Sequence, residues 1–178
     1  MISWELLRAR VTSEMASMQA NASLTSAQAH EKLARVISME YDKAVRNGKE
    51  PLTGATLLTA NVAALKNNII SGMALNDATL LLQAIMTGVV AYWTGATLKA
   101  PVTPPSGHVG MSPQTPVLFP GAPVPIIPIP PISPAPTLFV NSIITSFTTH
   151  ITTISGIHPF MLLPSPMPPY PLPWMGLI

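Results

Sequence analysis

The charged residues of this chain are confined to its first part. Every Asp, Glu, Lys and Arg lies at or before Lys99, and 20 of the 21 prolines lie after it. Exposed charge keeps apolar surface dispersed in water. We therefore expect the charge-free second half to be covered by other protein. The distribution points to a role in assembly more than to a role in chemistry.

Composition excludes several classes of function. The chain of 178 residues contains no cysteine, which rules out disulfide scaffolds, thiolate zinc sites and cysteine nucleophiles. Its net charge is only +2, with nine basic and seven acidic groups scattered along the first half. A nucleic-acid-binding surface needs a clustered basic face. Nucleic acid is therefore not an expected partner.

Capping signals and apolar spacing predict two helices early in the chain. The first is expected to have Ser3 as its N-cap and to run through Met18. In the second, Thr25 and Gln28 match a capping box, and apolar residues follow at steps of three and four. Gly48 is expected to end this helix in a left-handed conformation, which glycine adopts at little steric cost.

Two further helices are expected in the charged half. The third is predicted from Ala55 to Ser71, where apolar residues again recur at helical spacing. The fourth is predicted to begin at Asn76 or Asp77, either of which can cap it, and to end near Trp93 to Gly95. The aromatic pair formed by Tyr92 and the following tryptophan is expected to plug the core.

Residues 78–98 allow a second interpretation, because they carry no charge. A stretch of about 20 mostly apolar residues can span a membrane. However, a polar line runs along this segment at helical spacing, formed by Thr79, Gln83, Thr87 and Thr94. We therefore favour a helix that is buried in protein. A membrane-active protein that inserts residues 78–98 is the alternative.

Proline changes the expected structure after Lys99. Residues 100–138 hold a proline every few positions, and each proline fixes φ and removes a hydrogen-bond donor, so we expect an extended segment. Residues 139–156 carry apolar side chains at helical spacing opposite a Ser/Thr face, which predicts a helix, although β-branched residues also suit a strand. This helix is expected to pack on the preceding helices or on a copy of itself.

Together these patterns predict a mainly α fold. A small four-helix domain at residues 1–99 is followed by the Pro-rich extended segment at 100–138 and the further helix at 139–156. The last part, residues 157–178, contains seven prolines and is expected to form an extended apolar tail.

The large apolar residues of the Pro-rich segments are the candidates for contact with partners. Burying one such side chain contributes roughly 1.5–3 kcal/mol, and proline lowers the entropy that is lost when the chain is ordered. An arm of this kind is expected to dock on neighbouring subunits. The expected contact residues are Phe119, Ile126, Ile127, Ile129, Phe160, Leu162, Leu163, Tyr170, Trp174 and Ile178.

No constellation of residues predicts catalysis, a metal site or a cofactor. Nucleophile-elbow and phosphate-binding glycine motifs are absent. The carboxylates Glu31, Glu40 and Asp42 are expected to be surface charges on the second helix. An enzyme would need a pocket that places His150 or His158 beside one of these carboxylates. Metal-ligand spacing is absent from the four histidines, which are His30, His108, His150 and His158.

Two segments resemble small structural proteins of tailed bacteriophage virions. The first closes a predicted helix before the Pro-rich chain and reads Ala91-Tyr92-Trp93-Thr94-Gly95-Ala96-Thr97. The second runs from Phe139-Val140-Asn141-Ser142-Ile143-Ile144 through Thr148-Thr149-His150 to Ile154-Ser155-Gly156. The resemblance implies a non-enzymatic, minor component of the tail, neck or baseplate. Such a protein is present in the virion in symmetric copies and contacts other virion structural proteins. The long proline tail departs from this pattern.

Overall fold

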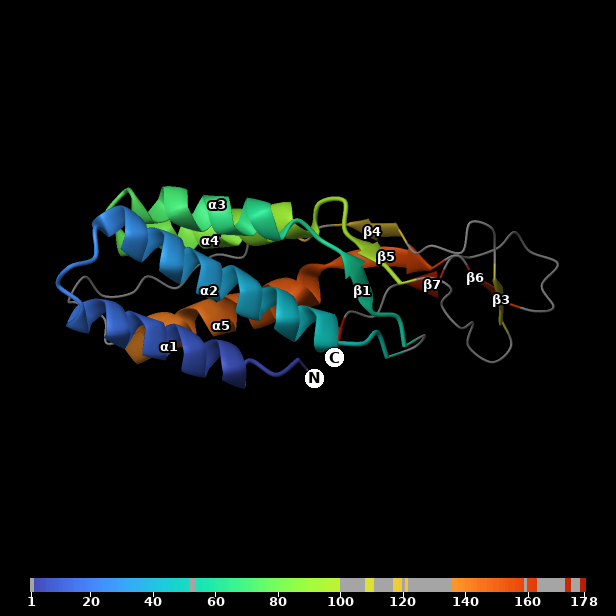
Figure 1. The fold of residues 1–178 in the computed structure, drawn as a ribbon. Coiled ribbons are helices and arrows are strands. Elements are labelled where there is room, and N and C mark those ends of the chain that lie inside the picture. Colours follow the sequence, from blue (N-terminus) through green and yellow to red (C-terminus); the bar gives the residue numbers. More distant parts are fainter. Residues whose placement is uncertain are drawn as a thin grey trace.

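We describe a computed structural model of the protein. It describes residues 2–51, 54–99, 108–110, 117–119, 121, 136–158, 160–162, 172–173 and 177–178. Within these residues the protein is mainly helical, with five helices and seven short strands. Figure 1 shows the helices packed side by side, with the strands gathered at one end of the bundle. The mainly α fold class is therefore confirmed.

The first helix, α1 (Glu5–Ala20), begins one residue later than the capping signal suggested. Its N-cap is Trp4, whose side chain makes no capping hydrogen bond. The prediction of Ser3 as the cap is wrong for a packing reason. The Trp4 ring stacks on Tyr41, with ring centroids 5.7 Å apart, so the helix start is positioned by burial of an aromatic ring and not by a hydroxyl cap.

The second helix, α2 (Ser26–Asn47), has the predicted capping box. Thr25 Oγ1 accepts a hydrogen bond from the backbone N–H of Gln28 at 3.3 Å, and the Gln28 side chain accepts one from the Thr25 N–H at 3.0 Å. The predicted left-handed end is wrong, because Gly48 is extended, with φ −69° and ψ 151°. A Cβ at Gly48 would lie 3.1 Å from the Ile2 side chain. Close approach of the chain therefore explains this glycine.

The predicted third helix is correct only in its second part. Helix α3 (Val62–Met73) begins at the N-cap Asn61, whose side chain accepts from the Ala64 N–H at 3.0 Å. The start at Ala55 is wrong, since strand β1 (Leu57–Thr59) precedes the helix and pairs antiparallel with β2 (Thr97–Leu98). Apolar residues suit a helix and a strand alike. Pairing with β2, which lies far along the chain, makes Leu57–Thr59 a strand.

Helix α4 (Ala78–Trp93) is a buried helix with the predicted cap. The Asp77 side chain accepts from the Leu80 N–H at 2.9 Å. Helices α3 and α4 approach closely where Gly72 lies against Ala84. Tyr92 and Trp93 are fully buried, as predicted. Across the described residues, none of the helices combines the length and the apolar character that a membrane crossing requires.

The predicted helix in the charge-free half is α5 (Pro136–Thr153), with bounds shifted toward the N-terminus. It begins at a proline, which suits a first helical turn because the missing N–H has no partner there. The end at residue 156 is wrong, because Ser155 and Gly156 belong to strand β5 (Ser155–His158). There Ser155 pairs with Phe119 and Gly156 with Leu118, which lie far back along the chain, and this pairing ends the helix.

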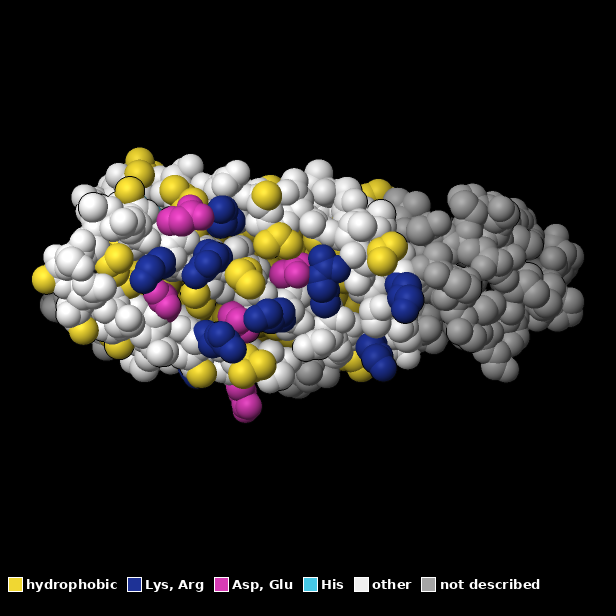
Figure 2. All heavy atoms as spheres, viewed as in Figure 1, with side chains coloured by type: hydrophobic (Ala, Val, Ile, Leu, Met, Phe, Trp, Pro, Cys, Tyr) yellow, Lys and Arg dark blue, Asp and Glu magenta, His cyan; other side chains and the backbone are white. Residues whose placement is uncertain are grey.

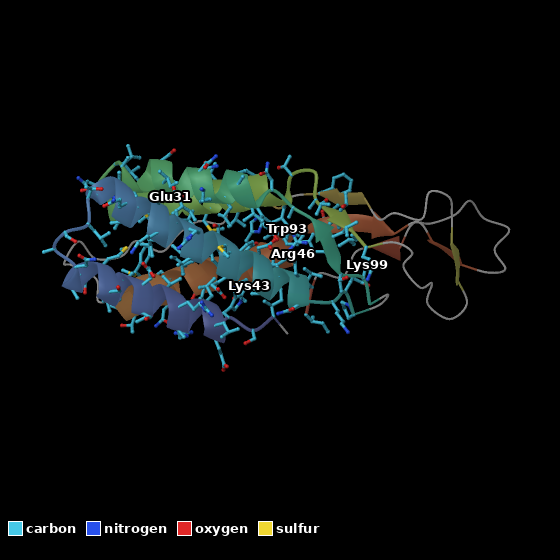
Figure 3. All side chains as sticks on the ribbon, in the orientation of Figure 1. Glu31, Lys43, Arg46, Trp93 and Lys99 are labelled. Carbon is cyan, nitrogen blue, oxygen red and sulfur yellow. The ribbon has the colours of Figure 1, made fainter. Side chains whose placement is uncertain are left out.

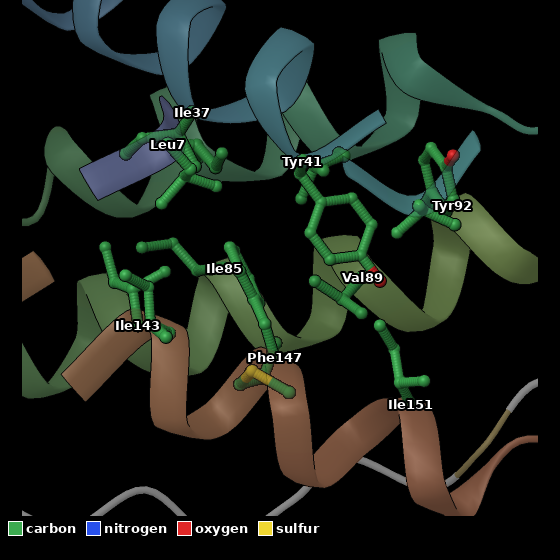
Figure 4. Close-up of a cluster of buried hydrophobic side chains, with 14 of the residues drawn as sticks. Leu7, Ile37, Tyr41, Ile85, Val89, Tyr92, Ile143, Phe147 and Ile151 are labelled. Atoms are coloured by element: carbon green, nitrogen blue, oxygen red, sulfur yellow. The ribbon is translucent and has the colours of Figure 1, made fainter. Parts of the chain in front are cut away.

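Helix α5 packs against the helices of the charged half and shares their core. Figure 4 shows side chains from α1, α2, α4 and α5 converging, among them Ile37, Val89 and Phe147. The α3 residues Leu65 and Ile69 belong to the same buried cluster. A side-chain hydrogen bond from Arg8 to Asn141 also links α1 to α5. The expectation that this helix packs on the preceding helices is confirmed.

The remaining strands lie in the regions expected to be extended. Strand β3 (His108–Gly110) pairs antiparallel with β6 (Phe160–Leu162). A second sheet has the order β4–β5–β7, formed by β4 (Val117–Phe119), β5 and β7 (Leu172–Pro173). Proline in β7 lies on an edge strand, where its missing N–H is tolerated. Most of residues 100–135 and 163–176 lie outside the described residues, so the extended arm stays a prediction.

Candidate interaction surface

A chain of polar contacts runs through the bundle from α4 to α2. The Trp93 Nε1–H donates to the Tyr41 hydroxyl at 2.8 Å, and the Tyr92 hydroxyl donates to Asp42 Oδ1 at 2.7 Å. Arg46 Nε donates to the other Asp42 oxygen at 2.7 Å. Figure 3 labels Arg46 of α2 and Trp93 of α4, the two ends of this set of contacts. These contacts satisfy polar groups that would otherwise be costly to bury.

Burial and these contacts shift the acid–base behaviour of the network. Burial raises the pKa of Tyr41, and burial together with the hydrogen bond to Asp42 raises the pKa of Tyr92. The hydrogen bond to Asp42 also raises the pKa of Arg46. Both tyrosines therefore stay protonated and serve as hydrogen-bonding groups.

The structure corrects the expected position of Glu40. It is buried, with 5% of the side chain exposed, and it pairs with Lys43 at 2.8 Å and Arg10 at 3.5 Å. Asp42 is also largely covered, in contrast to the expectation of a surface charge. Only Glu31 is exposed, and it pairs with Lys66 at 2.9 Å. Helical spacing placed these residues off the main apolar face of α2, but it did not reveal that α1 and α4 cover them.

The face of the bundle in Figure 2 carries basic and acidic side chains interspersed with each other. Four ion pairs account for much of this pattern, joining Arg10 and Lys43 to Glu40, Arg46 to Asp42, and Lys66 to Glu31. This face therefore offers no block of a single charge to a partner.

The outer side of α5 differs from that charged face. Its exposed residues include Thr145, Thr149 and Thr152. The Thr149 hydroxyl donates to the backbone carbonyl of Thr145 at 2.9 Å, and the Thr152 hydroxyl donates to that of Thr149 at 2.7 Å. The hydroxyl donors of Thr149 and Thr152 are therefore used within the helix, and α5 has no Asp, Glu, Lys or Arg. Such a surface is less costly to cover than one bearing charges.

Two of the predicted contact residues have described, exposed side chains. Phe119, on the edge strand β4, is 47% exposed, and Ile178 is 54% exposed. Phe160 and Leu162 lie on β6, at the register positions opposite Gly110 and His108. The other predicted contacts lie outside the described residues, namely Ile126, Ile127, Ile129, Leu163, Tyr170 and Trp174. As contacts with a partner, all ten stay predictions.

Residues 177–178 bind to the bundle in a way that the sequence did not indicate. The N–H of Ile178 donates to the carbonyl of Lys49 at 3.0 Å, and the Lys49 N–H donates back to the Ile178 carbonyl at 3.0 Å. Beside this pair, Leu177 is 7% exposed and belongs to the core cluster. Burying a leucine contributes roughly 1.5–3 kcal/mol. We call the position taken by Leu177 and Ile178 next to Lys49 the terminal seat.

A buried histidine is the other feature that sequence analysis missed. His150 is fully buried on α5, and in the described part of the protein neither ring nitrogen has a hydrogen bond of normal geometry. Burial lowers its pKa, and the nearby backbone of Gly121 partly offsets this effect. The ring is therefore neutral in the folded protein. No contact joins it to the carboxylates Glu31, Glu40 or Asp42, whose partners are basic groups and Tyr92.

Two pockets among the described residues are open to solvent. One of about 250 Å³ lies beside His30, Met73 and Asp77, and one of about 350 Å³ lies beside Arg10 and Glu14. Within the described ranges there is no group of three or more His, Asp or Glu residues that could hold a metal ion. The lining of the second pocket also includes Ala9, Ser13 and Val36.

Comparisons with protein-family models, with curated proteins and with solved structures found no match.

Proposed function

We propose that this chain is a non-enzymatic structural protein of a tailed-bacteriophage virion, a minor component of the tail, neck or baseplate. In this role it joins neighbouring subunits through its charge-free Pro-rich arm. Its partners are other virion structural proteins and further copies of itself in a symmetric arrangement. The proposal combines the resemblance of Ala91–Thr97 and of residues 139–156 to such proteins with the physical properties of the second half.

One observation carries the proposal. All charged side chains lie at or before Lys99, yet the charge-free half still presents the exposed Phe119 and the hydroxyl-lined outer face of α5. Surfaces that lack charge favour covering by protein over contact with water. The ion-paired face of α2 contrasts with these surfaces, because its charged side chains are suited to contact with solvent.

The proposal is tested by asking whether particles contain the chain. Virions purified from the source would be digested and analysed by quantitative mass spectrometry. The proposal expects peptides of this chain at a fixed ratio to the other virion proteins. Absence of the chain from intact particles would contradict it.

A pair of matched variants then tests the role of the arm. Phe119→Ser changes an exposed residue of the charge-free half, and Leu58→Ser changes a residue of β1 that is 52% exposed. Both remove a similar apolar area from the surface, so both should leave folding nearly unchanged. We expect Phe119→Ser to reduce incorporation into particles several-fold and Leu58→Ser to have no such effect. Equal incorporation of the two variants would count against the arm as the joining element.

A further inference from the structure

His150 is buried near the end of α5 without a polar partner of its own. Its side chain is fully buried, and among the described residues neither ring nitrogen has a hydrogen bond of normal geometry. The residue lies shortly before strand β5, which begins at Ser155. A protonated imidazole carries two N–H donors and a charge, which a buried position without acceptors solvates poorly. Uptake of a proton therefore favours any conformation that uncovers the ring.

Among the described residues, no charged group compensates for a proton on His150. Helix α4 and strand β4 have no charged residue, and β5 contributes one titratable group, His158. The charged residues of α1 are Glu5, Arg8, Arg10 and Glu14. The pKa of His150 responds to burial and to the backbone of Gly121, and to none of these side chains. The proton is therefore opposed by burial alone.

Gly121, which comes shortly after β4, packs against the last turn of α5. A Cβ at this position would collide with Thr153 Oγ1 and would lie 3.1 Å from Thr153 Cβ. The Thr153 hydroxyl donates to the backbone carbonyl of His150 at 2.7 Å, which holds it in place. The backbone of Gly121 is also close enough to the His150 ring to influence its pKa. A proton on the ring would therefore act first on the packing of Gly121.

Strand β4 is an element of low cost to release. It has three residues and lies at the edge of its sheet, where the described residues pair it with β5 alone. Phe119 is already 47% exposed, and Leu118 is only partly buried. Separation of α5 from the bundle would instead expose the buried side chains of Phe147 and Ile151. Local opening occurs where few buried apolar contacts are lost, so β4 should open before the bundle does.

We propose that protonation of His150 releases β4 and Gly121 from β5 and α5 while the helical bundle stays folded. The molecule then has a closed form at neutral pH and an open form in mild acid. In the open form the ring reaches water and regains the ordinary pKa of histidine, about 6.5. Because the open form binds the proton more tightly, its population rises as the pH falls. This inference does not depend on the proposed role in a virion.

Hydrogen exchange of the full-length chain measures the release. Deuterium uptake would be followed in peptides that cover β4 and Gly121, and in peptides of α2, at about pH 7.5 and at about pH 5, where most exposed carboxyl groups are still ionised. Wild type and His150→Phe would be compared at the same pH, because the intrinsic exchange rates then cancel. At the lower pH we expect several-fold faster exchange of β4 in wild type than in His150→Phe, and equal exchange of α2.

Two results of this comparison would overturn the inference. One is equal exchange of β4 in the two proteins at the lower pH. The other is loss of the helical circular-dichroism signal of wild type at that pH, since the acid would then unfold the bundle and not β4 alone. A His158→Gln variant should keep the acid response of wild type. If His158→Gln abolished the response, the switch would belong to β5 and not to His150.

A second variant tests the contact without relying on His150→Phe. Gly121→Ala adds the Cβ that collides with Thr153 and leaves His150 in place. We expect its β4 peptide to exchange several-fold faster than that of wild type already at about pH 7.5, with the helical signal retained. Exchange as slow as that of wild type would show that the packing of Gly121 does not hold β4 in place, which would also overturn the inference.

Discussion

Helices α2 and α5 bury one face in the same core but present opposite surfaces to the outside. The outer side of α2 carries long charged side chains, such as Glu31, which pairs with Lys66. The outer side of α5 carries threonines whose hydroxyls bond to the backbone of their own helix, as Thr149 does. The inner faces thus follow the same packing rules, while the outer faces differ in charge. We propose that the uncharged outer face of α5 contacts a protein neighbour, while the charged outer face of α2 contacts water.

The largest loss in the free energy of unfolding is expected at the core that α2 and α5 share. Phe147 of α5 is fully buried and lies 4.6 Å from the Tyr41 ring of α2. Truncating a buried phenylalanine costs about 3–5 kcal/mol, so Phe147→Ala should lower the free energy of unfolding by that amount. Urea denaturation followed by circular dichroism measures it. If the loss stayed below about 1 kcal/mol, α5 would not be an integral part of the core.

A smaller loss is expected in the polar network that joins α4 to α2. Tyr41→Phe removes the hydroxyl that accepts from Trp93 Nε1 and leaves a buried donor without a partner. Leaving such a group unsatisfied costs about 1–3 kcal/mol. The same denaturation experiment measures it, and Thr12→Val serves as a control, because Thr12 Oγ1 is a buried polar atom without a hydrogen bond in the described part of the chain. An equal loss in both variants would show that the network contributes nothing of its own.

Acid should act on the charge-free half through His150. Its pKa is lowered from the ordinary 6.5 by burial, so the folded protein binds this proton less readily than the unfolded chain does. The unfolding free energy contributed by neutral His150 is therefore complete above pH 6.5, and it is lost as the pH falls through the folded-state pKa. Helices α1 and α4 pack against α5, which carries His150. Helix α4 has no charged residue. The charged residues of α1 are Glu5, Arg8, Arg10 and Glu14.

The measurement compares urea midpoints at neutral and mildly acidic pH for three proteins. The wild-type chain and a His30→Gln control, which removes a histidine of α2, should both lose stability in acid. His150→Phe should flatten this dependence. If His150→Phe kept the full acid sensitivity, another group would be responsible.

A charge introduced on the outer face of α5 should have the smallest effect on stability but a large effect on assembly. Thr149→Lys places a charge on the outer face of α5, and Met39→Lys places one on α2 at a position that is 46% exposed. Both should change the free energy of unfolding by no more than about 0.5 kcal/mol, because both sites are exposed. Only Thr149→Lys should prevent incorporation into particles, as followed by mass spectrometry. Normal incorporation of Thr149→Lys would show that the outer face of α5 takes no part in assembly.

The parts of the fold that local signals control were predictable from the sequence. The Thr25–Gln28 capping box, the Asp77 cap and the apolar spacing of α5 each led to the right element. The failures arose where distant residues decided the outcome. Ser3 lost the cap position to Trp4 because a ring could be buried, and Leu57–Thr59 became a strand because Thr97–Leu98 offered a partner.

The candidate site was predictable only in its general character. Loss of charge and gain of proline predicted that the second half is a region for contact. Phe119 and Ile178 are exposed, and their contact with a partner stays a prediction. The terminal seat was not foreseeable, because backbone pairing between Ile178 and Lys49 leaves no pattern in the side chains. Burial of His150 carried a weak signal, since it follows Phe147 at helical spacing on the apolar side.

The ring cluster at the centre of the bundle also gives the molecule a built-in optical reporter. Tyr41 of α2 contacts Trp4 beside α1, Tyr92 of α4 and Phe147 of α5, while Trp93 lies 5.6 Å from Tyr92. Each tyrosine ring lies close enough to a tryptophan indole to transfer its excitation energy to it. The emission colour and intensity should therefore register the departure of α1, α2 or α4 from the cluster, without a dye or a label.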